Sequence, residues 1–411
     1  MNNTDIFTHW KKNTALFMSG QTVSLFGSML VQYALAWHVT LKTQSGSIMT
    51  IFIIAGFLPM FFISPFAGVW ADRFNRKYLI NIADASIALA TLIVAVLYSF
   101  GYDSIWILLI AAAVRSLGQG VQTPAVNAFI PQIVPQEHLT RVNGINSSLQ
   151  SMTMVVCPLL SGLLLTIAPI QFIFYIDVIT AAAGISVVLF LVKSATLPHV
   201  PDERQHYFYD LKEGWKYIAS HGLVLRLILI NTVFFIAGSP TMFLTPLQIA
   251  RKFGAEVWRL TIMEVCFAGG MTAGGVLISF WGGFKNRAFS LAVANLLFGI
   301  EAIALGITGN FWLYNAIMAF MGITVPLFNT PAAVMIQTNV ENAYMGRVFS
   351  VLSMVSSLAM PAGMLVFGPL ADIVSIDTLL IGTGIVTALL FWPLVLSRTI
   401  REAGRTRLPA N

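Results

Sequence analysis

The sequence is organised around one short basic segment, which reads Gly68-Val69-Trp70-Ala71-Asp72-Arg73-Phe74-Asn75-Arg76-Lys77. Apolar runs lie on both sides of it, at roughly residues 47–70 and 78–100. Each run is long enough to cross a bilayer as a helix, which takes about 20 apolar residues. The segment is therefore predicted to be a loop between two membrane-spanning helices.

The composition of the whole chain agrees with this prediction. Of its 411 residues, 57% are apolar and only 10% are charged, and the mean hydropathy is +0.80. Soluble proteins carry about 25% charged residues, so this chain has too few charges to cover a soluble surface. Its apolar runs lack the alternation of barrel strands. We expect an all-α membrane protein.

Twelve apolar runs form two sets of six, separated by the most polar stretch of the chain. The expected organisation is an N-terminal six-helix bundle (1–193), a cytoplasmic linker (194–220) and a C-terminal bundle with a short basic tail (221–411). The linker is predicted to hold a short surface helix at Tyr209–Ala219. The runs lie at roughly 14–40, 47–70, 78–100, 104–130, 144–167, 171–193, 222–249, 259–281, 288–308, 311–337, 348–372 and 377–397.

The distribution of positive charge predicts the orientation. With the N-terminus in the cytoplasm, most of the 23 Lys and Arg residues fall in cytoplasmic segments. Cytoplasmic loops of membrane proteins carry such an excess, so both termini are expected inside. The net charge of +6 then reports topology rather than nucleic-acid binding.

The two halves repeat a pattern. Thr123-Pro124-Ala125 is followed by Arg141-Val142, and Thr330-Pro331-Ala332 is followed by Arg347-Val348. Both blocks lie at the cytoplasmic end of the fourth predicted helix of their half. Repeated helical halves are typical of secondary transporters, whose substrate site lies near the membrane midplane.

The loop segment, a G-x-x-x-D-R-x-x-R-K pattern, resembles the signature of the major facilitator superfamily. Arg115-Ser116-Leu117-Gly118-Gln119-Gly120 is similar to the fourth-helix motif of that superfamily. The resemblance implies two pseudo-symmetric six-helix bundles that transport by alternating access. Cys157-Pro158-Leu159-Leu160-Ser161-Gly162 is similar to the fifth-helix motif of the antiporters, although Cys157 and Ser161 depart from its glycines.

The loop segment is also predicted to act as a conformational latch. Gly68 would permit close helix contact, and Asp72 is an anion able to cap the N-terminus of a neighbouring helix. The basic residues Arg73, Arg76 and Lys77 would pair with acids or lipid phosphates. A simple positive-inside loop would explain the basic residues but not Gly68 and Asp72. The corresponding loop of the second half, residues 279–287, keeps only the basic character.

Further blocks resemble the bacterial macrolide-efflux (Mef) branch of the superfamily. This resemblance implies a macrolide antibiotic as substrate, the proton gradient as energy source and the bacterial inner membrane as location. The blocks are Gln21-Thr22-Val23-Ser24-Leu25, Gly56-Phe57-Leu58-Pro59, Thr123-Pro124-Ala125-Val126-Asn127, Ser147-Ser148-Leu149-Gln150-Ser151, Gly346-Arg347-Val348-Phe349-Ser350 and Ser357-Leu358-Ala359-Met360-Pro361.

Charged residues inside the predicted spans are candidates for proton coupling, because a charge in the membrane is costly and usually functional. Glu264 is the first candidate, since its helix should line the cavity in this fold. Its alternative role is a rim carboxylate paired with Arg259 or Arg251. The full candidate set is Glu264, Asp84, Arg115 and Asp177.

Structural roles remain open for the other three candidates. Asp84 could pair with the basic loop or with Arg115, which would also serve as its counter-charge in coupling. Arg115 could be held by backbone carbonyls. Asp177, like Glu301, could pair inside its bundle.

Aromatic, methionine and amide side chains on the predicted spans are candidates for drug binding, because methionine adapts to varied ligands. Each could instead serve helix packing. The candidates are Gln21, Gln32, Tyr33, Trp37, Asn127, Asn146, Gln150, Met354 and Met360.

Other functions find less support. No phosphate-binding G-x-x-x-x-G-K-[ST] loop occurs, and a separate ATP-binding partner has no support in the sequence. Neither a catalytic grouping nor the spacing of a metal site is evident, so no enzyme activity, cofactor or metal is expected. The expected partners are a drug, protons and the bilayer. Export of an endogenous product such as a siderophore is the alternative, and a non-transporting membrane scaffold is the alternative from another class.

Overall fold

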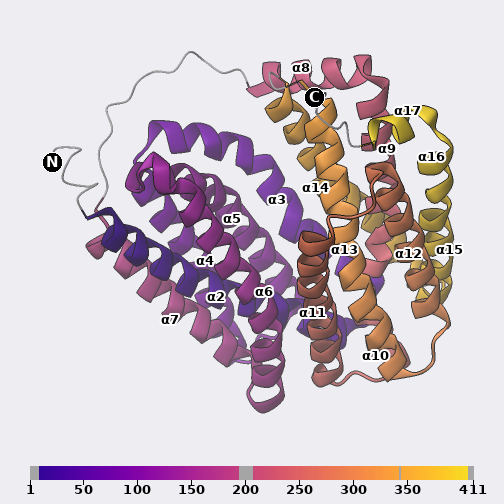
Figure 1. The fold of residues 1–411 in the computed structure, drawn as a ribbon. Coiled ribbons are helices and arrows are strands. Elements are labelled where there is room, and N and C mark those ends of the chain that lie inside the picture. The colour runs from indigo at the N-terminus through magenta and orange to yellow at the C-terminus, as the bar shows by residue number, and fades with distance from the viewer. Residues whose placement is uncertain (1–8, 194–206, 342–343, 406–411) are drawn as a thin grey trace. The chain divides into compact units, whose positions relative to one another are not determined.

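The computed structural model describes residues 9–193, 207–341 and 344–405 (Figure 1). Throughout these ranges the regular structure is helical, with one isolated bridge between Asn286 and Arg405. Twelve spans within the described ranges are long and apolar enough to cross a membrane. The all-α class and the twelve predicted spanning helices are confirmed.

Two compact units make up the chain. The first comprises Met1–Val39 and Ile51–Asp202, and the second comprises Thr40–Thr50 and Glu203–Asn411. Residues 40–50, which comprise the short turn between the first two spanning helices and the adjoining helix ends, thus belong with the second unit. This assignment could not be predicted from the sequence, because these residues lie far from most of that unit along the chain.

The helices of the first unit carry indigo to magenta colours in Figure 1. They are α2 (Trp10–Thr43), α3 (Gly46–Arg73), α4 (Arg76–Ser99), α5 (Ile105–Ile133), η1 (Gln136–His138), α6 (Leu139–Ile167), α7 (Ile170–Ser186) and η2 (Val187–Leu191).

The second unit also contains short helices beside its spanning ones. The helix predicted at Tyr209–Ala219 is present as α8, with Tyr217 and Ile218 buried. The helices are α8 (Tyr207–Ser220), α9 (Gly222–Phe243), α10 (Thr245–Lys252), α11 (Val257–Trp281), α12 (Arg287–Ile307), α13 (Phe311–Asn339), α14 (Met345–Leu370), α15 (Ile376–Leu389), α16 (Phe391–Leu396) and α17 (Arg398–Ala403).

The repeat predicted from the sequence recurs in the helices. Both α5 and α13 have 29 residues, and each carries its repeated proline, Pro124 or Pro331, in its last third. The helices α4 and α12 begin alike, since Asn75 and Asn286 each accept a hydrogen bond from the backbone N–H two residues further on, at 3.0 Å. Asparagine is among the strongest N-cap residues, so the two halves share helix signals as well as helix order.

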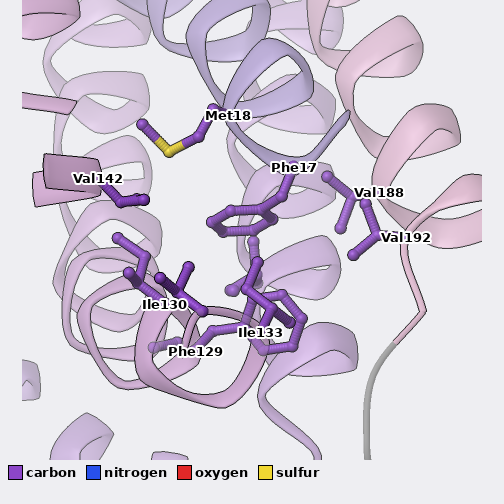
Figure 2. Packing of buried hydrophobic residues seen from close by; sticks show 11 residues of the cluster. Phe17, Met18, Phe129, Ile130, Ile133, Val142, Val188 and Val192 are labelled. Carbon is purple, nitrogen blue, oxygen red and sulfur yellow. The ribbon is translucent and has the colours of Figure 1, made fainter. Parts of the chain in front are cut away.

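An apolar cluster packs α2 against α5 and η2 in the first unit. Figure 2 shows Phe17 of α2 beside Phe129 of α5, and the two ring centroids lie 4.9 Å apart. Val188 and Val192 close the cluster from η2 and the residue that follows it. Helices in lipid associate through such packing, because lipid is as apolar as the side chains.

In the second unit, glycines bring helices into backbone contact. A Cβ added at Gly274 of α11 would lie 2.6 Å from the carbonyl oxygen of Ile323 on α13. One added at Gly299 of α12 would lie 2.5 Å from the carbonyl oxygen of Gly384 on α15. Small residues at these two crossings therefore fix how closely the spans pack.

The topology can be tested at the two ends of a single helix. Ser104 precedes α5 and Gln136 follows it, and both side chains are exposed. With Cys157 and Cys266 replaced, we expect Ser104→Cys to react with a membrane-impermeant maleimide in intact cells. Gln136→Cys should react only after the cells are permeabilised. The opposite pattern would contradict cytoplasmic termini.

Candidate transport site

The basic residues of the loop segment bind helix ends. Arg76 Nε donates to the carbonyl of Ala71 and its Nη1 to that of Ala128, both at 2.7 Å. Lys77 Nζ donates to the carbonyl of Val192 at 2.7 Å. We expected acids or lipid phosphates as partners. Ala71 lies at the end of α3 and Val192 just after η2, and carbonyls at helix C-termini lack intrahelical donors and carry partial negative charge, so they attract the same cations.

The other residues of the predicted latch are Gly68, Asp72 and Arg73, and neither Gly68 nor Arg73 makes a contact of the predicted kind among the described residues. A Cβ at Gly68 would meet no described atom within 4 Å, so the close helix contact expected of this glycine is not found among the described residues. Arg73 is exposed. The side chain of Asp72 lies outside the described residues, and its capping role stays a prediction.

Arg115 lies at the centre of a buried polar network in the first unit. Its Nη1 donates to Asp177 Oδ2 at 2.6 Å and to the Thr91 hydroxyl, and its Nη2 donates to the carbonyl of Ser28 at 3.0 Å. Thr91 and Ser28 hydroxyls also donate to Asp177, at 2.9 and 3.2 Å. Arg115 is 2% exposed and Asp177 is 0% exposed. The network joins α2, α4, α5 and α7.

This network shows the contacts of two of the coupling candidates, Arg115 and Asp177. Asp177 pairs inside its bundle, as the structural alternative held, and Arg115 is held by that carboxylate as well as by a carbonyl. The Arg115 guanidinium, which we expected as a counter-charge for Asp84, is instead bound to Asp177. The sequence did not indicate Thr91 or Ser28, because single hydroxyls in apolar helices carry no distinctive pattern.

Asp84 lies in a separate chain of amides. It is 4% exposed on α4, and Gln21 Nε2 of α2 donates to its Oδ2 at 3.2 Å. Gln122 Nε2 of α5 donates in turn to Gln21 Oε1 at 2.8 Å. Neither the basic loop nor Arg115 pairs with Asp84 among the described residues. Its described hydrogen-bond partner is neutral.

Glu264 lies two turns into α11 and is half-buried. The rim pairing considered for it does not occur among the described residues, because Arg259 pairs with Glu256 at 2.9 Å and Arg251 with Asp372 at 3.1 Å. Glu301 accepts a hydrogen bond from Thr324 at 2.8 Å, which places it in a contact between α12 and α13.

The drug-binding candidates divide by exposure. Trp37 is 1% exposed, so it belongs to the packed interior of the first unit rather than to a binding surface, which corrects our expectation. Asn127 and Gln150 are exposed, and Gln21 is bound within the amide chain. The half-buried candidates are Gln32, Tyr33, Asn146, Met354 and Met360.

The two departures in the fifth-helix motif make contacts of their own. Cys157 Sγ lies 3.6 Å from the carbonyl oxygen of Phe26, and the Ser161 hydroxyl donates to the carbonyl of Leu30 at 2.7 Å. Side chains that bind α2 thus stand where the motif has glycines. Within the described residues no three His, Cys, Asp or Glu side chains gather as metal ligands would.

The sequence reasoning missed Asp372, which binds the turn at residues 45–47 in the second unit. A signal was present. Gly368-Pro369-Leu370-Ala371-Asp372 repeats the Gly-x-x-Ala-Asp pattern of Gly68-Val69-Trp70-Ala71-Asp72.

The chain is similar in sequence to membrane transporters over most of its length. The macrolide efflux protein A of Streptococcus pyogenes is 29% identical over 397 residues, which cover 95% of this chain and 97% of the relative. The staphyloferrin A transporter of Staphylococcus aureus is 25% identical over 375 residues, 88% of this chain and 90% of the relative.

The fold has solved counterparts as well. The crystal structure of a bacterial homologue of the human lysosomal transporter Spinster superposes with a TM-score of 0.70 at 16% identity, over 98% of this chain and 99% of the other. A family model described as Major Facilitator Superfamily matches residues 14–363. The resemblance seen in the sequence is confirmed, and the chain belongs to the major facilitator superfamily of membrane transporters.

Proposed function

We propose that this transporter exports macrolide-type antibiotics in exchange for protons, by alternating access. The near full-length similarity to macrolide efflux protein A supports the choice of substrate. The observation that supports proton coupling is the environment of Asp84, a buried acid whose described hydrogen-bond partner is neutral. The proposed location is the bacterial inner membrane, with both termini in the cytoplasm.

The argument for Asp84 compares it with Asp177, the neighbouring carboxylate on α7. Asp177 touches a guanidinium and two hydroxyls, so losing its charge would leave Arg115 buried and unpaired. Among the described residues, the hydrogen bond that Asp84 receives comes from the neutral amide of Gln21. Burying an unpaired charge is costly, and uptake of a proton removes that cost. We therefore assign proton binding to Asp84 and a structural role to Arg115 and Asp177.

Glu264 is the proposed second proton-binding acid. It is half-buried and has no ion-pair partner among the described residues, so it is not committed to a structural contact. The drug contacts are proposed to come from Asn127, Gln150 and the half-buried amides, Tyr33, Met354 and Met360.

Siderophore export is the second candidate, because one relative is a staphyloferrin A transporter. A siderophore that binds as an anion needs exposed positive charge. Arg115 cannot supply it, being 2% exposed and paired with Asp177. This observation favours the macrolide proposal.

Whole-cell uptake of a labelled macrolide tests the proposal. Expressing cells should accumulate several-fold less drug than vector cells, and an uncoupler should raise accumulation to the vector level. Equal accumulation in both cell types contradicts macrolide export. Lower accumulation that survives the uncoupler contradicts proton drive, and a parallel assay of labelled staphyloferrin A tests the second candidate.

A further inference from the structure

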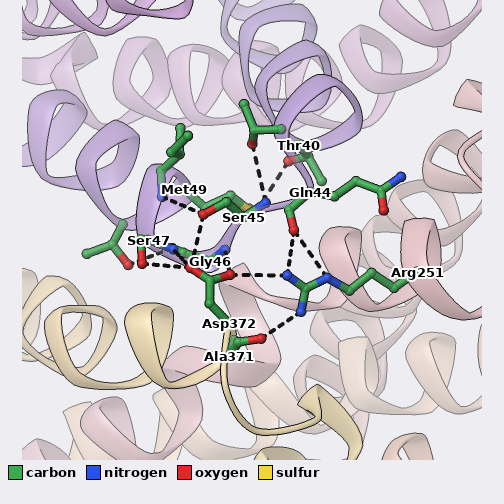
Figure 3. Close-up of polar contacts among 12 residues, drawn as sticks. Thr40, Gln44, Ser45, Gly46, Ser47, Met49, Arg251, Ala371 and Asp372 are labelled. Carbon is green, nitrogen blue, oxygen red and sulfur yellow. Dashed lines mark hydrogen bonds and ion pairs between the residues drawn. The ribbon is translucent and has the colours of Figure 1, made fainter.

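Asp372 caps the start of α3, a helix that begins 326 residues before it in the sequence. Its Oδ1 accepts from the backbone N–H of Gly46 at 2.7 Å, and its Oδ2 from that of Ser47 at 2.9 Å. The hydroxyls of Ser47 and Ser45 add bonds of 2.7 and 3.0 Å (Figure 3). The first N–H groups of a helix lack intrahelical partners and carry partial positive charge, which this carboxylate satisfies.

Arg251, at the end of α10, completes the contact. Its Nη2 lies 3.1 Å from Asp372 Oδ1, and its Nη1 donates to the carbonyl of Ala371 at 2.6 Å. Its Nε donates to the carbonyl of Gln44 at 3.2 Å. Gln44 has φ 47°, a left-handed conformation that non-glycine residues rarely adopt. One guanidinium therefore holds both the turn after α2 and the end of α14, as Figure 3 shows.

The helix ends at this contact also fit closely. A Cβ at Gly46 would collide with the carbonyl oxygen of Gly368, and one at Gly368 would collide with the Thr50 hydroxyl. That hydroxyl donates to the carbonyl of Met364 at 3.0 Å. The turn is thus seated against α14 by shape as well as by charge.

The contact does not depend on a proton in the working range of pH. Burial acts to raise the pKa of the Asp372 carboxyl, but the hydrogen bonds from Ser47, Gly46 and Ser45 outweigh it and lower the pKa to about 2. A lowered pKa means that the contact stabilises above the ordinary value of 3.8 and is lost only as the pH falls through about 2. Proton uptake by the transporter therefore does not release it.

The position of the contact suggests a role in transport. Residues 40–50 belong to the second unit, whereas the rest of α2 and α3 belongs to the first. Asp372 ends a Gly-x-x-Ala-Asp pattern at the close of α14, and Asp72 ends the same pattern at the other end of α3. A carboxylate holds a helix end through its charge and its hydrogen bonds. These interactions can form and break together, as a reversible contact requires.

We propose that Asp372, with Arg251, is a second latch, which holds residues 40–50 in the second unit during one half of the transport cycle and releases them in the other. The proposal rests on alternating access in the proposed function. It makes Asp372 a positioning residue, with no contact to drug or proton.

A distance measurement tests the latch without drug or pH gradient, so its result is independent of the substrate. Spin labels at Ser104→Cys and Gly309→Cys mark the loops before α5 and α13, one in each unit, in a cysteine-free background. The wild type should show two distance populations. Asp372→Asn should shift their ratio by about tenfold, the effect of one charge-assisted hydrogen bond. Arg251→Gln should shift it in the same direction.

Asp377→Asn is the matched control. Asp377 pairs with Lys252 at 2.8 Å and Gln248 at 2.6 Å, so it is a similar contact in the same unit without residues 40–50. It should leave the ratio unchanged. A ratio unaltered in both Asp372→Asn and Arg251→Gln makes the contact a static cap and overturns the proposal. An equal shift in Asp377→Asn, or a single population in every protein, overturns it as well.

Discussion

Asp84→Asn should abolish uphill drug export while leaving drug binding within about twofold of wild type. Moving one charge through 100 mV is worth about 2.3 kcal/mol, so one proton at about 150 mV supports a drug gradient of a few hundred-fold. Asparagine fills the same space and still accepts a hydrogen bond from Gln21, but it carries no proton. In proteoliposomes with an imposed pH gradient, the drug ratio across the membrane should fall to about one.

Two variants give this experiment its controls. Glu137→Gln changes an acid that is 77% exposed and should transport like wild type. Glu264→Gln should lose part of the gradient if the second acid also binds protons. An Asp84→Asn protein that still concentrates drug would remove Asp84 from the mechanism, and a complete loss in Glu264→Gln alone would assign the proton to Glu264.

Arg115→Met should lower the free energy of unfolding by about 3–5 kcal/mol, because it leaves Asp177 charged and buried without its cation. Asp177→Leu should lower the free energy of unfolding by a similar amount, because it leaves Arg115 charged and buried without its anion. Unfolding in mixed micelles with increasing SDS, followed by tryptophan fluorescence, measures the change.

The double variant Arg115→Met/Asp177→Leu separates a structural pair from a coupling pair. Replacing a whole buried ion pair with apolar side chains is often close to neutral, so the double variant should recover most of the lost stability. It should also regain export. Recovered stability without export would instead place the pair in the coupling mechanism.

The sequence was sufficient to predict the helices and their repetition. Apolar runs of about 20 residues define spans by length alone, and the blocks around Pro124 and Pro331 marked equivalent helices. The pattern at 68–77 pointed to the superfamily because its spacing combines a glycine, an acid and basic residues.

Partners between distant helices could not be predicted in the same way. The choice of Asp177 over Asp84 as partner of Arg115 depends on how four helices are rotated, and the hydrophobic pattern of fully apolar spans does not encode rotation. Similarly, Arg76 and Lys77 bind carbonyls, which every residue has and no sequence motif reveals. Asp372 was overlooked because its partners lie in the turn at residues 45–47. In the sequence this turn stands in the N-terminal half of the chain, far from Asp372.

Because α2 is long, we expect the transport rate of this protein to depend on bilayer thickness. Its 34 residues extend about 50 Å at 1.5 Å per residue, whereas the hydrocarbon core of a bilayer is about 30 Å thick. Part of the helix therefore lies among head groups or in water, and the exposed Lys42 stands at its last turn. A thicker membrane would draw this polar end toward hydrocarbon at a cost for each ångström. Lipids of increasing chain length should consequently slow the transporter even where every side chain is unchanged.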